Sequence, residues 1–297
     1  MSIEHGDTDR WPPPPALSSA FFKAHGLGND YLVLEEGEDW IATPEAVARV
    51  CEPHRGVGSD GVVALLRDRS GDAYRLRMFN PDGSEFERSG NGLRVFASFL
   101  ARRGDAPPYR VLVAGEEVVM QVHGSRAGLH DVSVDLGSAR TGPDAVRLAP
   151  EALSSDGTLP GPVGEPLRVV PVSVGNPHVV VLDEGVTEKR LAELGPFLVR
   201  HPAFAHGTNV QLAEATPEGG GRALIWERGV GRTSASGTSA CAVAVALVTS
   251  GRARVGDVAI SMPGGDLSVN VSPELDIVLR GPVEEVCVGV LSEPLLL

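Results

Sequence analysis

Two serine-containing segments could do chemistry, because each brings small polar residues to the start of a predicted helix. Ser89-Gly90-Asn91-Gly92 opens an apolar stretch in the first half of the chain, and Ser236-Gly237-Thr238-Ser239 opens another in the second half. Such a start leaves several backbone N–H groups free at the positive end of the helix dipole. Two such helix ends facing each other would form a cradle for an anion such as a carboxylate.

Other polar landmarks repeat at the same spacing. Asn29, Asn80 and Ser89 recur as Asn176, Glu227 and Ser236, with 147 positions separating the members of each pair. A single serine at a helix start is more often a cap than a catalytic group. Three landmarks in one register instead predict two copies of one structural unit, with the site between them.

The elements that position these landmarks are predicted from local patterns. Thr43 and Pro44 are typical of the N-cap and first position of a short helix, which we expect to run through Cys51. The stretch 240–248 is apolar on nearly every face, so we expect a buried helix that ends by Gly251. The remaining patterns predict a helix over 93–100 that ends near Gly104, and strands over 21–24, 31–34, 74–79, 132–136, 169–174, 179–182 and 223–226.

Each half is therefore predicted to be a sheet around one central helix. We expect a flexible tail over residues 1–19, which contains four consecutive prolines, a first domain over 20–139 and a second over 140–281. The boundary is placed in the Gly-, Pro- and Ser-containing stretch near 137–143. A chain of 297 residues suits about two domains.

Composition excludes several classes of function. The net charge of −13 argues against a nucleic-acid or anionic-membrane partner. No apolar run approaches the roughly 18 to 20 residues of a membrane span, and the N-terminus lacks the pattern of a signal peptide. Cys51, Cys241 and Cys287 form no CxxC pair, and the histidines form no HExxH pair, so we expect reduced thiols, a cytoplasmic location and no metal.

Six segments, in order along the chain, resemble the motifs of the diaminopimelate epimerases. The similarity extends from about residue 21 to residue 297. It implies an α+β fold with two pseudo-symmetric domains, each a curled mixed sheet around a central helix, and a deep cleft between them. It also implies that the C-terminal strand, 282–297, returns to the first domain, and that the protein is a homodimer. The segments are 23–30 (KAHGLGND), 80–85 (NPDGSE), 90–94 (GNGLR), 175–178 (GNPH), 208–210 (TNV) and 227–233 (ERGVGRT).

The resemblance also implies a chemistry and a partner for each motif. The family inverts an α-carbon without a cofactor, converting LL- to meso-diaminopimelate, a precursor of lysine and peptidoglycan. One cysteine thiolate removes the α-proton and a second thiol protonates the opposite face. The implied substrate-binding residues are Gly90, Asn91, Gly237 and Thr238 for the α-carboxylate, Glu227 and Asn80 for the α-ammonium, and Asn29, Asn176, Asn209 and Arg228 for the distal end, where Arg228 offers a guanidinium fork.

This chain departs from the family at the reacting groups, because Ser89 and Ser236 occupy both cysteine positions. A thiol has a pKa of about 8.5 and an alcohol is nearer to water, about 15.7, so the exchange adds on the order of 10 kcal/mol to forming the base. A serine can still act if another group takes its proton, and His25 and His178 are candidates for that role or for a purely structural one. Cys241 is no substitute, because it lies five residues further along the helix.

Several explanations fit the double serine. The chain could be a natural branch that transfers protons through assisted serines, or an engineered inactive form made to trap a substrate. It could instead be an isomerase or dehydratase of specialised metabolism, or a protein that only binds an amino acid. Gly61 is a further departure, because many members of the family carry a larger amide there. The preserved polar motifs favour an amino-acid ligand, and we expect a cofactor-independent epimerase with catalytic positions Ser89 and Ser236.

Overall fold

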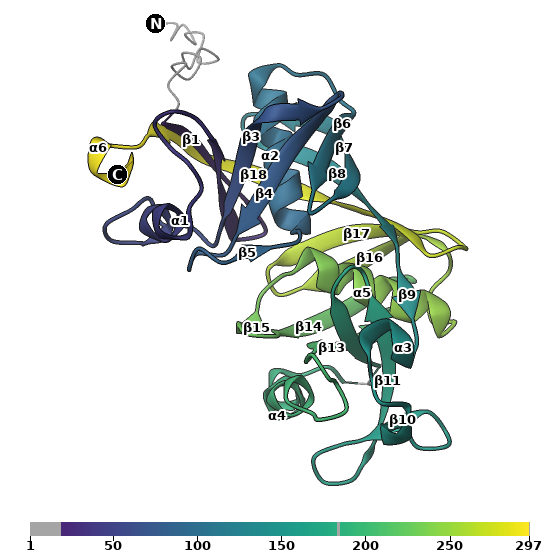
Figure 1. Cartoon of the computed structure of the whole chain (residues 1–297). Helices are drawn as coiled ribbons and strands as arrows, with labels where there is room; N and C mark the ends of the chain where they lie inside the picture. The colour runs from purple at the N-terminus through teal and green to yellow at the C-terminus, as the bar shows by residue number, and fades with distance from the viewer. Residues whose placement is uncertain (1–18, 183–184, 297) are drawn as a thin grey trace, which may run out of the picture.

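The computed structural model describes residues 19–182 and 185–296, which form two lobes, and one long strand near the C-terminus crosses between them (Figure 1). Of the predicted tail over 1–19, only Ser19 is described. It is buried, and its carbonyl accepts a hydrogen bond of 2.8 Å from the backbone N–H of Leu291. Within the described ranges, no helix combines the length and apolar character that a membrane crossing requires.

The first lobe is a curled sheet around helix α2. Its β1 pairs antiparallel with β2, β2 parallel with β3, β3 antiparallel with β4 and β4 parallel with β6, which continues antiparallel into β7 and β8. The elements of this lobe are β1 (Ala20–Gly26), β2 (Asn29–Glu35), α1 (Pro44–Cys51), β3 (Val62–Ser70), β4 (Ala73–Phe79), β5 (Glu85–Phe86), α2 (Gly90–Arg103), β6 (Tyr109–Val113), β7 (Glu116–Arg126) and β8 (Leu129–Ser138).

The second lobe repeats this pairing order around helix α5. Here β11 pairs antiparallel with β12, β12 parallel with β13, β13 antiparallel with β14 and β14 parallel with β16, which continues antiparallel into β17 and β18. The elements are β9 (Arg140–Thr141), α3 (Pro143–Val146), a 3-10 turn (Pro150–Ala152), β10 (Thr158–Pro160), β11 (Pro166–Ser173), β12 (Pro177–Leu182), α4 (Glu188–Val199), β13 (Asn209–Ala215), β14 (Gly221–Glu227), β15 (Gly231–Thr233), α5 (Gly237–Thr249), β16 (Gly256–Met262), β17 (Gly265–Val271), β18 (Asp276–Val290) and α6 (Glu293–Leu296).

The repeated order of pairing confirms the predicted α+β fold with a curled mixed sheet around a central helix in each half. Both central helices begin three residues before the predicted starts at 93 and 240, with Ser89 at the N-cap of α2 and Ser236 at the N-cap position of α5. Gly104 ends α2 in the left-handed conformation that glycine adopts without strain, at a φ of 85°. Every residue of α5 from Ser239 to Leu247 is buried, as expected for a helix that is apolar all round.

Strand β18 connects the two lobes. The bounds predicted for this strand, 282–297, are wrong, because it begins six residues earlier, at Asp276, and ends at Val290, before the short helix α6. Its first part pairs with β17, its last part pairs with β1, and β8 runs along the other edge. In Figure 1 this strand crosses from the lower lobe to the upper one. The hydrogen-bonded sheet is continuous across the two lobes, and we propose that the domains divide near residues 139 and 281.

Candidate active site

A cleft of about 870 Å³ lies between the lobes. It is lined by the ends of β2, β4 and β14, by the glycine turns after β1 and before β12, and by the first residues of α2 and α5. All twelve residues predicted to be catalytic or to bind substrate face this one cavity. They are Asn29, Asn80, Ser89, Gly90 and Asn91 from the first lobe, and Asn176, Asn209, Glu227, Arg228, Ser236, Gly237 and Thr238 from the second.

The N-termini of the two central helices meet at the floor of the cleft. A Cβ atom placed on Gly237 would lie 3.6 Å from the Cα atom of Gly90, and 2.8 Å from Leu279 Cδ2 on β18. A Cβ on Gly90 would likewise lie 2.8 Å from Leu279 Cδ2, so glycine at both positions leaves room for the Leu279 side chain beside the helix ends. The approach brings two sets of free N–H groups and two positive dipole ends together, which is the geometry of an anion site.

Ser89 behaves as an N-cap. Its hydroxyl oxygen accepts a hydrogen bond of 3.1 Å from the backbone N–H of Gly92, and its side chain is half-buried. The phenol of Tyr31 lies beside this hydroxyl, and burial, the main cause, raises the pKa of Tyr31 to about 12. The phenol therefore stays protonated at neutral pH, so Ser89 has a neutral hydroxyl as its neighbour rather than a base.

Ser236 has a different environment, although it occupies the matching position. Its hydroxyl caps no N–H of α5 and instead acts as a hydrogen-bond donor on the carboxylate of Glu227. Burial raises the pKa of Glu227 above the usual range, and the Ser236 hydroxyl partly opposes this effect. The two serines are thus related by position but differ in their partners, one facing a phenol and the other a carboxylate.

In the first lobe, the side chains of Asn91, Asn29 and Asp60 form a chain of hydrogen bonds. Asn91 Nδ2 donates to Asn29 Oδ1 at 2.9 Å, and Asn29 Nδ2 donates to Asp60 Oδ2 at 3.0 Å. Asp60 also accepts from the backbone N–H of Asp30 at 3.1 Å. Because an amide group has two N–H donors and two lone pairs, Asn29 and Asn91 each keep one donor for a ligand.

In the second lobe the amides are fixed by their own neighbours. Asn209 donates to the carbonyl of Pro177 at 3.1 Å and accepts from the backbone N–H of Arg228 at 2.9 Å. The Arg228 side chain is anchored by the carbonyl of His206 and keeps further donors at the mouth of the cleft. Asn80, at the end of β4, donates to the Ser84 hydroxyl at 2.9 Å and occupies the position that matches Glu227.

Neither histidine candidate lines the cleft. His178 is fully buried, donates from Nε2 to Asn176 Oδ1 at 2.8 Å, and accepts at Nδ1 from Gln211 Nε2 at 3.0 Å. Burial lowers its pKa to about 3, so it is a neutral ring that orients Asn176. His25 accepts from the backbone N–H of Gly28 at 3.3 Å, and its other nitrogen lies 3.9 Å from Glu284. The groups that adjoin the serines are Tyr31 and Glu227 instead.

Sequence reasoning missed two residues that line the cleft, Tyr31 and Arg88, and it also missed Arg94, which is fully buried in α2 and does not line the cleft. Arg88 lines the cleft and donates to the carbonyl of Leu136 in the first lobe, at 3.1 Å, and to that of Val174 in the second, at 3.3 Å. The only sequence signal for Arg88 as a site residue was its position directly before Ser89. The bridging role depends on a contact between residues 86 positions apart, which no local pattern reveals.

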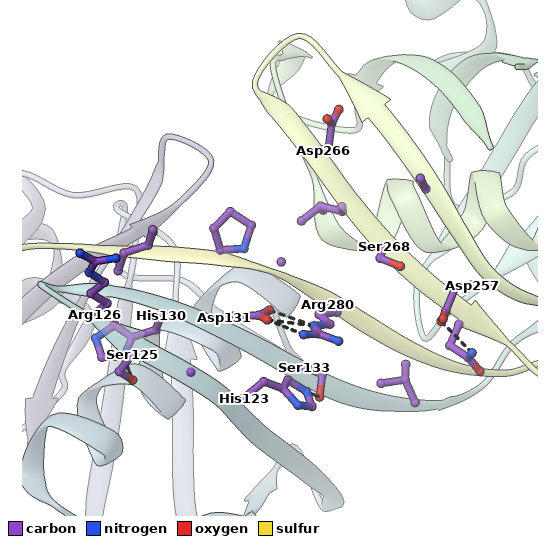
Figure 2. Close-up of a pocket in the computed structure, with 18 residues that line it drawn as sticks. His123, Ser125, Arg126, His130, Asp131, Ser133, Asp257, Asp266, Ser268 and Arg280 are labelled. Carbon is purple, nitrogen blue, oxygen red and sulfur yellow. Dashed lines mark hydrogen bonds and ion pairs between the residues drawn. The ribbon is translucent and has the colours of Figure 1, made fainter. Parts of the chain in front are cut away.

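The cysteines and a second groove lie outside this site. None of the three cysteines lines the cleft, and burial raises the pKa of both Cys51 and Cys241 to about 12. Figure 2 shows the second groove, of about 920 Å³, where β7, β8 and β18 face β16 and β17. It contains the ion pair between Asp131 and Arg280 and none of the twelve predicted site residues. Across the described ranges, no three His, Cys, Asp or Glu side chains gather as a metal site would require.

Comparisons with known proteins agree with this geometry. The family model described as diaminopimelate epimerase matches residues 21–142 and 170–286. The chain is 36% identical to a diaminopimelate epimerase of Synechococcus elongatus over 283 residues, covering 92% of this chain and 98% of the relative, and 38% identical to one of Desulforudis audaxviator, covering 91% and 98%. A crystal structure of a hydroxyproline epimerase from Agrobacterium vitis shares the fold, with a TM-score of 0.67, 17% identity and 91% coverage of both chains. The chain therefore belongs to the diaminopimelate epimerase family of isomerases.

Proposed function

We propose that this chain is a cofactor-independent amino-acid epimerase that acts on LL- and meso-diaminopimelate, at the step that supplies precursors for lysine and peptidoglycan. The observation that carries the proposal is the convergence of both helix N-termini and twelve motif residues on one cleft between the lobes. A zwitterion with a second carboxylate matches this arrangement of donors and acceptors. The curated relatives named above carry the same activity in their names.

Each part of the ligand has a complementary group in the cleft. In the proposed complex, the α-carboxylate lies between the helix ends, against the backbone N–H groups of Gly90 and Gly237. The α-ammonium faces the carboxylate of Glu227 and the amide of Asn80. The distal amino-acid end lies against the remaining amides and the guanidinium of Arg228, which is suited to a carboxylate because it presents several donors in a plane.

Inversion requires one group on each face of the α-carbon. One takes the α-proton, the electron pair stays on the carbon next to a carboxylate held by N–H donors, and the other group returns a proton from the opposite side. Ser89 and Ser236 occupy these two positions in the proposed complex, one at the start of each facing helix. Because a serine alkoxide is far costlier to form than a thiolate, we expect slow proton exchange in the native chain.

The serines also favour a second candidate, because no thiol lines the cleft. An isomerase or dehydratase of specialised metabolism could use the half-buried carboxylate of Glu227 as its base and move a double bond or a leaving group instead of inverting a centre. A binding protein without catalysis would keep the cradle and transfer no proton at all.

Exchange of the α-proton with solvent separates these candidates. The purified chain is incubated in deuterated water with LL-diaminopimelate, and with a panel of other amino acids, and the products are followed by proton NMR and mass spectrometry. We expect slow deuteration at the α-carbon of diaminopimelate, and none with a Ser89→Ala/Ser236→Ala variant that still binds. Deuteration or a new double bond elsewhere in a different panel member would favour the second candidate, and binding without any exchange would favour the binding protein.

We also propose a cytoplasmic homodimer. The dimer follows from the family resemblance, and the exposed apolar side chains of Val286 and Val290 on β18 and of Leu129 on β8 are the surface that we propose it covers. Sedimentation velocity on the native chain and on Val286→Asp/Val290→Asp tests this, and a native chain that sediments as a monomer at micromolar concentration would contradict it.

A further inference from the structure

Arg94 is a fully buried arginine that reaches the junction of the two helix ends, and the proposed chemistry does not use it directly. It lies one turn into α2 and has no solvent exposure. Its guanidinium fits a slot between three glycines. A Cβ on Gly26 would lie 2.7 Å from Nη2, one on Gly237 would lie 3.5 Å from Nη1, and one on Gly281 would lie 3.8 Å from Cζ.

The guanidinium determines how the side-chain amides of Asn91 and Asn29 are oriented in the first lobe. Arg94 Nη2 donates to Asn91 Oδ1 at 2.6 Å, so the oxygen of Asn91 is turned away from Asn29 and its NH₂ group toward it. Asn29 is held in turn with its oxygen toward Asn91 and its NH₂ group toward Asp60. Because an arginine cannot accept a hydrogen bond, it fixes which end of each amide faces the cleft.

The rest of the guanidinium has no partner among the described residues. Arg94 Nε and Nη1 are buried and make no hydrogen bond there. Burial lowers the pKa of Arg94 to about 10, so the side chain is still a cation at neutral pH. A buried charge without a counter-ion is unfavourable, and this one lies next to Gly237, at the positive ends of both central helices. The positive potential of the Arg94 guanidinium therefore adds to that of the two helix dipoles at the floor of the cleft.

We propose that Arg94 is a positioning residue of the anion site, which orients the donor groups of Asn91 and Asn29 toward a bound carboxylate and supplies the buried positive charge that this carboxylate neutralises. The proposal rests on the proposed function, because it takes the α-carboxylate of an amino acid as the anion. It also explains why glycine occupies position 26, outside the helix starts, because a Cβ there would lie 2.7 Å from Arg94 Nη2.

The test is calorimetric titration of LL-diaminopimelate into the native chain, Arg94→Met and Arg94→Lys. Met keeps much of the volume and is suited to an apolar slot, and Lys keeps the charge but not the planar fork. Arg102→Met, in the last turn of the same helix, is the matched control. Loss of a charged hydrogen bond and of the charge should raise Kd about tenfold or more in Arg94→Met, less in Arg94→Lys, and leave Arg102→Met unchanged.

A double variant distinguishes action through Asn91 from a general effect on packing. If Arg94 acts by orienting Asn91, Arg94→Met should weaken binding less in an Asn91→Ala background than in the native chain. The proposal would be overturned if Arg94→Met raised Kd by the same factor in the Asn91→Ala background as in the native chain. A Kd for Arg94→Met within twofold of the native value would also overturn it. Arg94→Lys decides the matter if Arg94→Met does not fold, and a Kd equal to the native one would then refute the role of the fork.

A ligand-free measurement keeps this inference separate from the proposed function. In protein labelled with ¹⁵N-asparagine, the side-chain amide protons of Asn91 and Asn29 should exchange slowly with solvent in the native chain and much faster in Arg94→Lys. If the native chain gives no heat with diaminopimelate but shows this pattern, the proposed substrate is wrong and the positioning role stands. If the amide protons exchange at equal rates in both proteins, the positioning role is wrong.

Discussion

Replacement of both serines by cysteine should raise epimerisation of diaminopimelate by at least about a thousandfold. The pKa gap between an alcohol and a thiol is about 7 units, or on the order of 10 kcal/mol at 1.36 kcal/mol per unit. If only half of this difference reaches the transition state, the barrier falls by about 5 kcal/mol, which exceeds a thousandfold in rate. The rest of the cleft is already in place around both positions.

The structure also predicts which new thiol is the stronger acid. In Ser89→Cys, the thiol would lie where the Gly92 N–H now donates to the hydroxyl, at the positive end of α2, and both effects stabilise a thiolate. In Ser236→Cys, the thiol would lie beside the carboxylate of Glu227, which opposes ionisation. The thiol introduced by Ser89→Cys should therefore be alkylated faster than the one introduced by Ser236→Cys. In the double variant without ligand, the thiol at position 89 should be the one that is ionised.

The assay is the deuterium exchange described above, run on the native chain, both single variants and the double variant. Cys287 is exposed, so Cys287→Ser is the background for the alkylation rates. Each single replacement should restore little, because inversion needs a thiolate on one face and a thiol on the other, so the effects should be strongly non-additive. A native chain that epimerises diaminopimelate at an ordinary enzymatic rate would refute the thiol requirement. A double cysteine variant that binds but stays inert would favour the isomerase or dehydratase.

Three further predictions concern binding and stability. Arg228→Ala should weaken binding of LL-diaminopimelate by about 1.5 to 3 kcal/mol by calorimetry, if its charged hydrogen bonds hold the distal carboxylate, and an unchanged Kd would remove it from the site. Gly61→Ala should lower the free energy of unfolding by about 1 to 3 kcal/mol in urea titration, because its Cβ would lie 2.7 Å from both the Tyr31 ring and the Phe79 carbonyl; a stable variant would show that the ring has room to move. His178 has a folded pKa of about 3 against 6.5 when unfolded, so its contribution to stability is present above pH 6.5 and lost as the pH falls toward 3. Between pH 7 and pH 5 the free energy of unfolding of the native chain should therefore fall by about 2 kcal/mol more than that of His178→Gln. Equal decreases in the two proteins would mean that the ring titrates normally.

The sequence predicted α1, the two central helices, some of the strands and twelve residues that line the cleft, because these depend on short-range signals, whereas α4, β13, β16 and β17 were not predicted. Thr43 caps α1 by accepting from the backbone N–H of Ala46 at 3.2 Å, as its place before Pro44 indicates. The helix starts at residues 90 and 237 follow from glycine and small polar residues in sequence. The constant spacing of the landmarks then implied one cleft for all of them.

Orientation was not predictable, because it depends on partners distant in sequence. Ser89 and Ser236 occupy matching positions, yet only the first caps its helix, since Glu227 takes the hydroxyl of the second. His178 follows the second glycine turn, which makes it a candidate base in sequence, but Gln211, in the neighbouring strand, holds it in the core. His25 and His178 therefore lie next to the glycine turns, but their ring nitrogens hydrogen-bond to other protein groups and neither histidine lies beside Ser89 or Ser236.

The central claim is that the site still binds its amino acid although both thiol positions carry serine. Calorimetric titration of LL-diaminopimelate into the native chain tests it most directly, because backbone N–H groups do not depend on whether Cβ carries sulfur or oxygen. We predict one ligand per chain, and weaker binding of L-lysine, which lacks the distal carboxylate. Absence of heat at millimolar concentration, for diaminopimelate and for other diamino or zwitterionic amino acids, would contradict the assignment of this cleft as an amino-acid site.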